Sequence, residues 1–252
     1  MTLVGVLRYE FLMQVRRPVV WLVLILVALL SSFPFLQGLP IELTGLEVAA
    51  GVTHLMNTFM PIAFGILLAD RLPRDRRLNT NELLASFPSS AGTRLWGKFL
   101  GAAAATAVPL GALYLVVAGM LAMQRGDASI LAFELPLLIL TVLPGLILVS
   151  AFSMICTEFL PVPLYTILFI GYWFWGNVVS PSRIPTLACT PLTPIGGFAE
   201  HGILGTPGGL CSGLIPPVTP AQGWLSIALL IGVAAVAMLA GQFYSNWRME
   251  ES

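Results

Sequence analysis

Residues 92–99 read GTRLWGKF and match most of the phosphate-binding pattern G-x-x-x-x-G-K-[S/T]. In that pattern the lysine and backbone N–H groups hold phosphates, and the final hydroxyl binds magnesium. Phe99 stands at the last position here and cannot bind a metal ion. The pattern also needs a preceding strand and a soluble helix, whereas a long apolar run follows Lys98. We therefore predict that Lys98 is a cation that snorkels to the membrane boundary and binds no nucleotide.

Other residues able to carry chemistry are few. The chain has two histidines and contains no HExxH, CxxC or GxSxG pattern, so we expect neither an enzyme nor a metal site. The adjacent Glu200 and His201 are read as incidental. His54 and Asn57 share one helix face, where interhelical hydrogen bonds or a place on a substrate path are the alternatives. Glu134 is expected at an outer span boundary, which leaves an ion-driven carrier without a good intramembrane carboxylate.

The composition defines the elements that must position these residues. Of 252 residues, 57% are hydrophobic and 10% are charged, whereas about a quarter are charged in a soluble domain. The net charge of zero offers no footprint for nucleic acid. Several apolar runs could cross a bilayer as helices of roughly 20 residues. These runs cover residues 18–36, 48–69, 99–123, 135–156, 159–179 and 223–244.

The runs do not alternate in polarity as transmembrane strands do. We therefore predict an all-α integral membrane protein with a single domain of six transmembrane helices over residues 1–252. Thr157 and Glu158 are expected to form the tight turn between the fourth and fifth spans.

The basic residues set the expected orientation. All twelve Lys and Arg residues except Arg125 and Arg183 precede the first run, lie between the second and third, or follow the last. Because basic residues accumulate on the cytoplasmic side, both termini and residues 70–98 are expected in the cytoplasm. Residues 180–222 are then extracytoplasmic. The predominance of Arg over Lys favours a bacterial source, and hence the plasma membrane.

Residues 75–101 read DRRLNTNELLASFPSSAGTRLWGKFLG. This stretch resembles the first cytoplasmic loop of the permease subunit of type-2 ATP-binding-cassette (ABC) exporters, in which an acidic residue precedes G-T-x-E-L-L-x-x-x-P and a later G-K. Asn79 replaces the usual glycine, a mild departure because Asn tolerates positive φ better than most residues. The matching residues are Asp75, Thr80, Glu82, Leu83, Leu84, Pro88, Gly97 and Lys98.

The resemblance implies that this loop forms a coupling helix in a groove of a separate ATPase subunit. Leu83, Leu84 and Phe87 recur at helical spacing and would form its apolar face. Thr80 could cap the helix, and Pro88 would end it. The alternative is a solvated basic loop without a partner. The residues expected to contact the ATPase are Asp75, Arg76, Thr80, Glu82, Leu83, Leu84, Phe87 and Pro88.

The resemblance also implies the assembly. Two permease subunits, identical or homologous, would each engage one ATPase subunit that binds ATP and magnesium, so this chain itself would hold no cofactor. Residues 1–17 resemble the connecting helix before the first span. An apolar face of Leu3, Leu7, Phe11 and Val15, with Glu10 elsewhere, predicts an amphipathic helix in the membrane interface; a plain surface anchor is the alternative.

A stripe of small residues follows the coupling segment. Gly97, Gly101 and Ala105 lie on one face of the third span, where another helix can approach closely. In the extracytoplasmic connection, residues 195–204 are a candidate for the short helices that the resembling family carries there. Cys189 and Cys211 lie in the same connection and could form a disulfide in an oxidising compartment. Cys156 is expected to be a free thiol.

These observations predict the permease subunit of an ABC exporter, which couples ATP hydrolysis by a separate nucleotide-binding subunit to export of a hydrophobic or amphipathic substrate. The sequence does not choose among lipids, lipid-linked glycans, drugs and peptides. One alternative is that the complex passes mechanical work to an extracytoplasmic protein without transporting a solute. Another is an ATPase-independent membrane scaffold or carrier.

Overall fold

Every element is a helix in the part of the chain that the computed structural model describes, residues 2–37, 43–77, 90–182, 184–206 and 217–250. No strand occurs within these ranges, so the all-α class is confirmed for them. The elements are α1 (Leu3–Val15), α2 (Pro18–Leu36), α3 (Gly45–Ala69), α4 (Arg71–Arg77), α6 (Ala91–Arg125), α7 (Ser129–Leu137), η1 (Leu138–Val142), α8 (Leu143–Phe159), α9 (Val162–Asn177), α10 (Gly197–Leu204) and α11 (Pro220–Glu250).

Polar residues cap several helix ends. At the start of α3, the Thr44 hydroxyl accepts a hydrogen bond from the Glu47 N–H at 3.3 Å, and the Glu47 carboxylate accepts one from the Thr44 N–H at 2.8 Å. This reciprocal pair is a capping box. The Ser90 hydroxyl accepts from the Thr93 N–H at 3.2 Å and starts α6. Gly126, with φ of 69°, ends α6 in the left-handed conformation that favours glycine.

Within the described residues, five helical stretches are long and apolar enough to cross a membrane, which indicates a membrane protein. They are Pro18–Phe35, Gly45–Arg74, Gly92–Arg125, Ser129–Phe159 and Pro220–Trp247. The remaining predicted span, residues 159–179, corresponds mainly to α9, which has 16 residues. Such a helix extends about 24 Å, less than the roughly 30 Å of a hydrocarbon core.

The turn before α9 differs from the prediction. Thr157 lies inside α8, where its hydroxyl donates to the Met154 carbonyl at 2.9 Å. The expectation that Thr157 and Glu158 form the turn is therefore wrong. The helix ends instead at Phe159, because Leu160 adopts extended backbone with φ of −113° and ψ of 141° before a proline.

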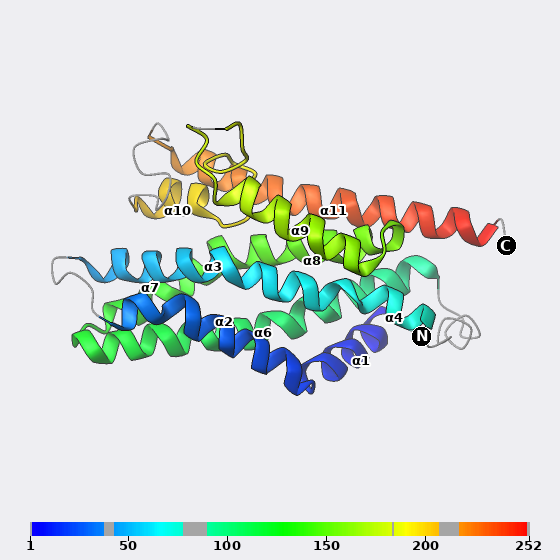
Figure 1. Ribbon diagram of the computed structural model, residues 1–252, viewed down its shortest axis with the longest axis horizontal. Helices are drawn as coiled ribbons and strands as arrows, with labels where there is room; N and C mark the ends of the chain where they lie inside the picture. Colours follow the sequence, from blue (N-terminus) through cyan, green and yellow to red (C-terminus); the bar gives the residue numbers. More distant parts are fainter. Residues whose placement is uncertain (1, 38–42, 78–89, 183, 207–216, 251–252) are drawn as a thin grey trace.

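The long helices lie side by side along the long axis of the bundle (Figure 1). Both chain termini and α4 lie at one end, which we call the basic end because Arg71, Arg74 and Arg94 belong to elements that meet there. The other end, here the opposite end, carries α10 and the turn between α6 and α7. Successive long helices therefore run back and forth between these two ends.

The core follows α3, which contacts α2, α6, α7, α8 and α9. Its side chains Met56, Met60, Phe64 and Leu68 are fully buried. The outer faces of α2 and α11 carry large exposed apolar side chains instead, such as Leu30 at 68% exposure. An exposed surface of this extent is unusual for a soluble protein, and it fits helices whose outer faces contact lipid.

The helical stretch from Ser129 to Phe159 contains one π-helical turn, η1. There the Leu143 N–H donates to the Leu138 carbonyl, five residues back. Pro144 follows directly and has no N–H for the normal bond four residues back. Such single turns occur frequently at functional sites, and η1 faces the segment that leads into α10.

Candidate functional site

The segment predicted to contact an ATPase falls largely beyond what the structure describes. The described chain stops at Arg77 and resumes at Ser90. Asp75 and Arg76 are placed as backbone of α4, without a description of their side chains. The other predicted contacts lie outside the described ranges: Thr80, Glu82, Leu83, Leu84, Phe87 and Pro88.

The two flanks of that segment are well defined. Both α4 and the beginning of α6 lie at the basic end (Figure 1). α4 packs against α8, and its Arg71 and Leu72 are buried. The connection over residues 78–89 therefore joins two elements that are anchored in the bundle, at the end that also holds both termini.

Residues 92–99, which match the phosphate pattern, lie within α6 and form no loop. A phosphate-binding loop presents its backbone N–H groups before a helix begins, and helix α6 has already started at Ala91. Lys98 is 9% exposed and Phe99 is 4% exposed. The prediction that Lys98 snorkels outward is therefore wrong, because the packing at this point encloses it.

α1 lies directly on the small residues of α6. A Cβ added at Gly97 would lie 2.8 Å from the Cβ of Val6, and one added at Gly101 would lie 2.7 Å from the carbonyl oxygen of Leu7. Real Cβ atoms almost never come this close to another heavy atom. Ala105 is fully buried one turn further along. The helix that approaches the small-residue stripe is thus the N-terminal helix itself.

The face of α1 that packs against the bundle is a different face from the apolar one that is expected to meet the membrane interface. The buried side chains are Val6, Glu10 and Gln14, whereas the expected apolar face was Leu3, Leu7, Phe11 and Val15. Gln14 donates from Nε2 to the Thr106 hydroxyl at 2.7 Å. α1 thus turns polar side chains toward α6, where hydrogen bonds and close packing hold helices together in a membrane.

At the opposite end, His54 and Asn57 contact the segment before α10. The Asn57 amide donates from Nδ2 to the Ile195 carbonyl at 2.7 Å. A Cβ added at Gly197 would lie 3.6 Å from His54 Cε1. One added at Gly145 in α8 would lie 2.2 Å from the Pro194 carbonyl oxygen. These contacts fix residues 194–197 against α3 and α8, so the hydrogen bond of Asn57 goes to the connection before α10, whereas a bond between helices was one of the two expected alternatives.

Glu134 is a buried carboxylate that the sequence placed at a span boundary. It is fully buried, and its Oε1 accepts from the Thr53 hydroxyl at 2.9 Å. Neither its Oε2 nor the buried hydroxyl of Tyr114 has a hydrogen-bond partner among the described residues. The helical stretch begins at Ser129, not at residue 135, so Glu134 lies inside the helix, and its position relative to the membrane boundary stays a prediction.

α10 carries a second buried carboxylate, Glu200. It is 3% exposed and accepts from the Thr206 hydroxyl at 2.6 Å. Burial raises the pKa of Glu200 to about 7, and the hydrogen bond from Thr206 opposes part of this rise. The ring of the neighbouring His201 lies against the Thr206 carbonyl. The adjacent Glu and His therefore both hold the chain that follows α10, a role that the sequence did not reveal.

The cysteines fall into two kinds. Cys189 is disulfide-bonded, and Cys156 is a free thiol. Cys211 lies outside the described residues, so its pairing with Cys189 stays a prediction. No group of three His, Cys, Asp or Glu side chains in the described part of the chain could hold a metal ion.

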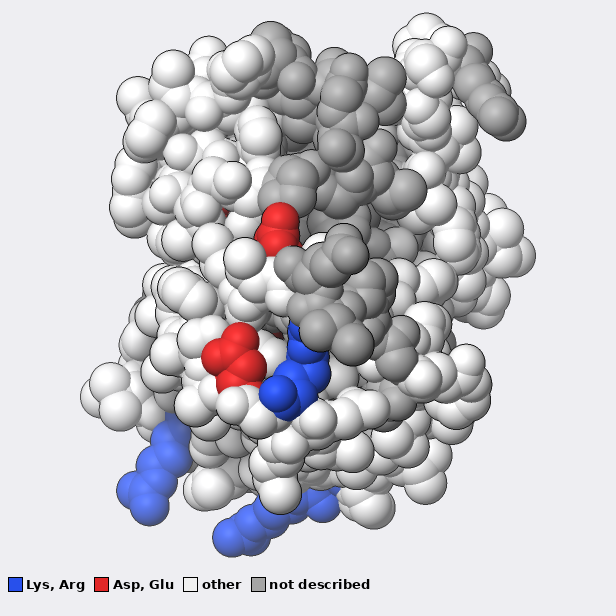
Figure 2. All heavy atoms as spheres, turned by 90° about the vertical axis from the view of Figure 1, so that its left-hand side faces the viewer, with Lys and Arg blue, Asp and Glu red and all other residues white. Residues whose placement is uncertain are grey.

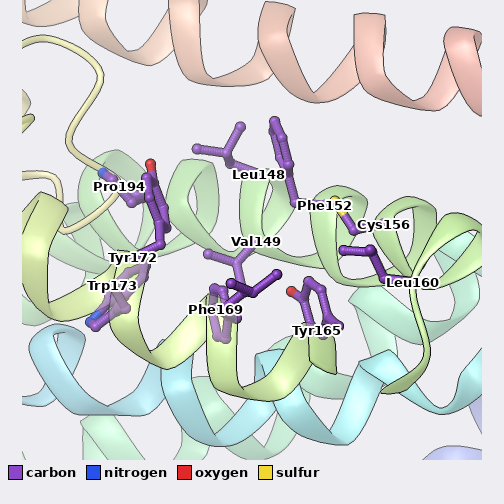
Figure 3. Close-up of a pocket in the computed structure, with 11 residues that line it drawn as sticks. Leu148, Val149, Phe152, Cys156, Leu160, Tyr165, Phe169, Tyr172, Trp173 and Pro194 are labelled. Carbon is purple, nitrogen blue, oxygen red and sulfur yellow. The ribbon is translucent and has the colours of Figure 1, made fainter. Parts of the chain in front are cut away.

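A cavity of about 310 Å³ lies between α8 and α9. Figure 3 shows its lining side chains, which α8 and α9 contribute together with Pro194 from the segment before α10. Five of them are aromatic, namely Phe152, Tyr165, Phe169, Tyr172 and Trp173. No motif in the sequence predicts this cavity, although the aromatic residues of α9 recur at helical spacing.

The surface of the opposite end carries few charges. Figure 2 shows this face, on which small groups of both signs stand among uncharged residues. A face of this kind offers no strong attraction to a highly charged solute.

A comparison with protein-family models finds no match to this chain, and a comparison with curated protein sequences finds none either.

Proposed function

We propose that this chain is the membrane permease subunit of a type-2 ABC exporter in a bacterial plasma membrane. The observation that carries the proposal is the stretch from Asp75 to Gly101, which resembles the coupling loop of that family. Its flanks, α4 and the first turn of α6, lie at the basic end together with both termini. Basic residues favour the cytoplasmic side, which is where an ATPase subunit would bind.

In this proposal six helices cross the membrane, and α9 is the shortest. The arrangement of the termini supports a sixth crossing. Five crossings would leave the two termini on different sides, whereas both lie at the basic end (Figure 1). α9 follows α8 and leads back toward the opposite end, so in this proposal it would complete an even number of passes.

The coupling segment would pass motion to the bundle through its two flanks. On one side α4 continues from α3 and packs on α8. On the other side α6 begins and holds α1 through Gly97 and Gly101. A movement of residues 78–89 would therefore reach the most buried span and the N-terminal helix together. ATP and magnesium would bind to the partner subunit, and two permease subunits would enclose the path of a hydrophobic or amphipathic substrate.

Co-purification tests this proposal. The full-length chain, isolated from its native host in mild detergent, should bring down an ABC ATPase subunit in a one-to-one ratio. The complex should hydrolyse ATP in proteoliposomes, while the isolated permease should bind no nucleotide analogue. Recovery of the chain without any nucleotide-binding protein, in a detergent that preserves other ABC complexes, would reject the proposal.

Glu134 favours a second candidate function, an ion-coupled carrier. Carriers of this kind use carboxylates inside the membrane and interrupted helices near them. Glu134 is fully buried, and the π-turn η1 begins only four residues later. A proton or sodium gradient should then drive uptake or release in proteoliposomes without ATP, and Glu134→Gln should abolish it. Gradient-independent, ATP-dependent transport would exclude the carrier.

A further inference from the structure

The cavity between α8 and α9 has largely apolar walls, although three of its aromatic lining residues carry polar groups and Cys156 carries a thiol. The Tyr165 hydroxyl shares a hydrogen bond of 2.8 Å with the buried Ser153. The Trp173 indole N–H donates to the Thr58 carbonyl of α3 at 2.7 Å. Both polar tips are thus bound to the bundle. The rings of Tyr165 and Trp173 therefore present only their apolar surfaces to the cavity.

Backbone contacts hold the cavity open. A Cβ added at Gly65 of α3 would lie 2.6 Å from Phe169, so this ring presses directly on the α3 backbone and cannot move deeper. Tyr165 stacks on Phe169, with ring centroids 5.5 Å apart. At the opposite end, the close approach of the Pro194 carbonyl to Gly145 fixes the residue that closes the cavity. The cavity is therefore preformed.

The surroundings of the cavity are apolar as well. Leu168 lines it and is 52% exposed, and its neighbour Ile167, outside the cavity, is 69% exposed. Both belong to α9, in a protein whose outer helix faces contact lipid. Water needs two to four polar partners to occupy a cavity, which these walls do not provide. A volume of about 310 Å³ is at the lower end for ligand pockets, so the cavity fits a single acyl chain better than a whole lipid molecule.

One polar group of the lining is not bound to the bundle. The Tyr172 hydroxyl has no hydrogen bond to any described residue, and it points toward Pro194 at the end of the cavity nearest the opposite end of the bundle (Figure 3). Tyrosine favours positions where one side is apolar and the other is polar. A ligand with an apolar chain could therefore place a polar group beside this hydroxyl.

We propose that this cavity is a binding site for one acyl chain of a membrane amphiphile, whose polar head lies beside the Tyr172 hydroxyl. The site belongs to the isolated chain and requires neither an ATPase nor transport, so it can be tested apart from the exporter proposal. The acyl chain lies along Phe169 and Phe152, and Cys156 marks the end of the cavity that is farther from the polar head of the amphiphile.

Photo-crosslinking tests the site. The full-length chain in nanodiscs is exposed to a phosphatidylcholine that carries a diazirine midway along one acyl chain, and the crosslinked peptides are identified by mass spectrometry. Crosslinks should concentrate on residues 148–156 and 165–173. Leu168→Trp fills the cavity and should lower them at least fivefold, whereas the matched neighbour Ile167→Trp should leave them unchanged. Equal loss in both variants, or no preference for these peptides over the exposed face of α2, would overturn the proposal.

The wild-type protein provides a second measurement that needs no variant. Cys156 lines the cavity and is a free thiol. Lysophosphatidylcholine should slow the alkylation of Cys156 by N-ethylmaleimide at least threefold, while glycerophosphocholine, the head without a chain, should have no effect. Tyr172→Phe should weaken this protection for lysophosphatidylcholine. Alkylation at the same rate with and without the amphiphile would show that no chain occupies the cavity.

Discussion

Three buried polar side chains at the opposite end each have a specific partner. Asn57 binds the Ile195 carbonyl, Glu134 accepts from Thr53, and Glu200 accepts from Thr206. A buried polar group without a hydrogen bond costs free energy. The first bond holds the segment before α10 on α3, the second joins α7 to α3, and the third holds the chain after α10 on that helix. Among these three side chains, Glu134 has one oxygen, Oε2, that accepts no hydrogen bond from a described residue.

Glu200 predicts a pH dependence of stability. Burial raises its pKa to about 7, whereas an unfolded Glu titrates near 4.3. Since the folded pKa is the higher one, the folded state favours the neutral acid. The contribution of Glu200 to the free energy of unfolding should be constant below about pH 4 and should fall between about pH 4 and pH 7. The loss should be on the order of 3 kcal/mol, at 1.36 kcal/mol per pKa unit. Thermal unfolding of the wild type in detergent, from pH 4.5 to 8.5, measures it.

Two variants control this measurement. Glu200→Gln keeps an oxygen for Thr206 but cannot ionise, so it should unfold at a temperature nearly independent of pH and should exceed the wild type at pH 8. Asp127→Asn removes an exposed carboxyl whose pKa is lowered by hydrogen bonds from Ser129, and it should keep the wild-type decline. A flat wild-type profile would show that Glu200 ionises freely in the folded protein.

The sequence predicted the roles of individual residues where a short pattern along one helix carries the information. The spacing of Gly97, Gly101 and Ala105 indicated a close helix contact, and α1 packs on the two glycines. The burial of Glu134 was not predicted, because it depends on where the helix begins, and an apolar run does not reveal the helical turns that precede it. The sequence also did not reveal which face of α1 packs on α6, because apolar side chains can face lipid on the outside of a membrane protein, so the apolar face need not be the buried one.

At the scale of elements, α1 is held by the shape of α6 rather than by a large apolar face. Gly97 and Gly101 bring the two backbones together, and Gln14 binds Thr106. Packing and interhelical hydrogen bonds are the main forces between helices in lipid. The position of α1 should therefore depend on the small residues of α6.

Gly101→Val should displace α1. The added side chain would overlap the Leu7 carbonyl and the Glu10 side chain, and overpacking of this kind typically costs about 1–3 kcal/mol. Hydrogen exchange of residues 3–15 should accelerate about tenfold or more. Gly111→Val is the matched control on the same helix, since a Cβ there meets nothing within 4 Å. Equal exchange rates in both variants would show that α1 does not need this contact.

The coupling segment predicts a contrast between apolar and charged substitutions. If Leu84 and Phe87 fill a groove of the ATPase subunit, each contributes roughly 1.5–3 kcal/mol, while an exposed ion pair of Arg76 gives about 1 kcal/mol or less. Leu84→Asp or Phe87→Asp should therefore lower co-purification of the ATPase tenfold or more, and Arg76→Ala should lower it only slightly. All three proteins should insert, because these positions lie outside the long apolar runs of the sequence.

Transport by the surviving complexes completes that comparison. A variant that still binds the ATPase but hydrolyses ATP without transport would place the segment in coupling rather than in assembly. A normal complex with normal transport in both aspartate variants would mean that residues 80–88 are not the coupling element, and the exporter proposal would lose its main support in the sequence.

At the scale of the whole molecule, apolar runs located the long helices well. Runs starting at residues 18, 48, 99 and 223 lie within α2, α3, α6 and α11. The ends of the helices were less predictable, because polar first turns such as Gly45–Glu47 and Ala91–Lys98 continue a helix beyond the apolar run. The cavity could not be foreseen, since it depends on how Gly65 and Gly145 bring three separate elements together.

The orientation of the bundle gives the last prediction. Basic residues place the basic end in the cytoplasm, so the turn at Asp127 and residues near Gly208 should be extracytoplasmic, while residue 78 should be cytoplasmic. A cysteine introduced at each of these three positions in turn, in a Cys156→Ser background, can be labelled in intact cells with a membrane-impermeant maleimide, and the background protein alone measures any labelling of Cys189 and Cys211. Labelling is expected at 127 and 208, and at 78 only after the membrane is permeabilised. The reverse pattern would show that the protein has the opposite orientation in the membrane. Labelling at position 127 but not at position 208 would mean that α9 does not cross the membrane.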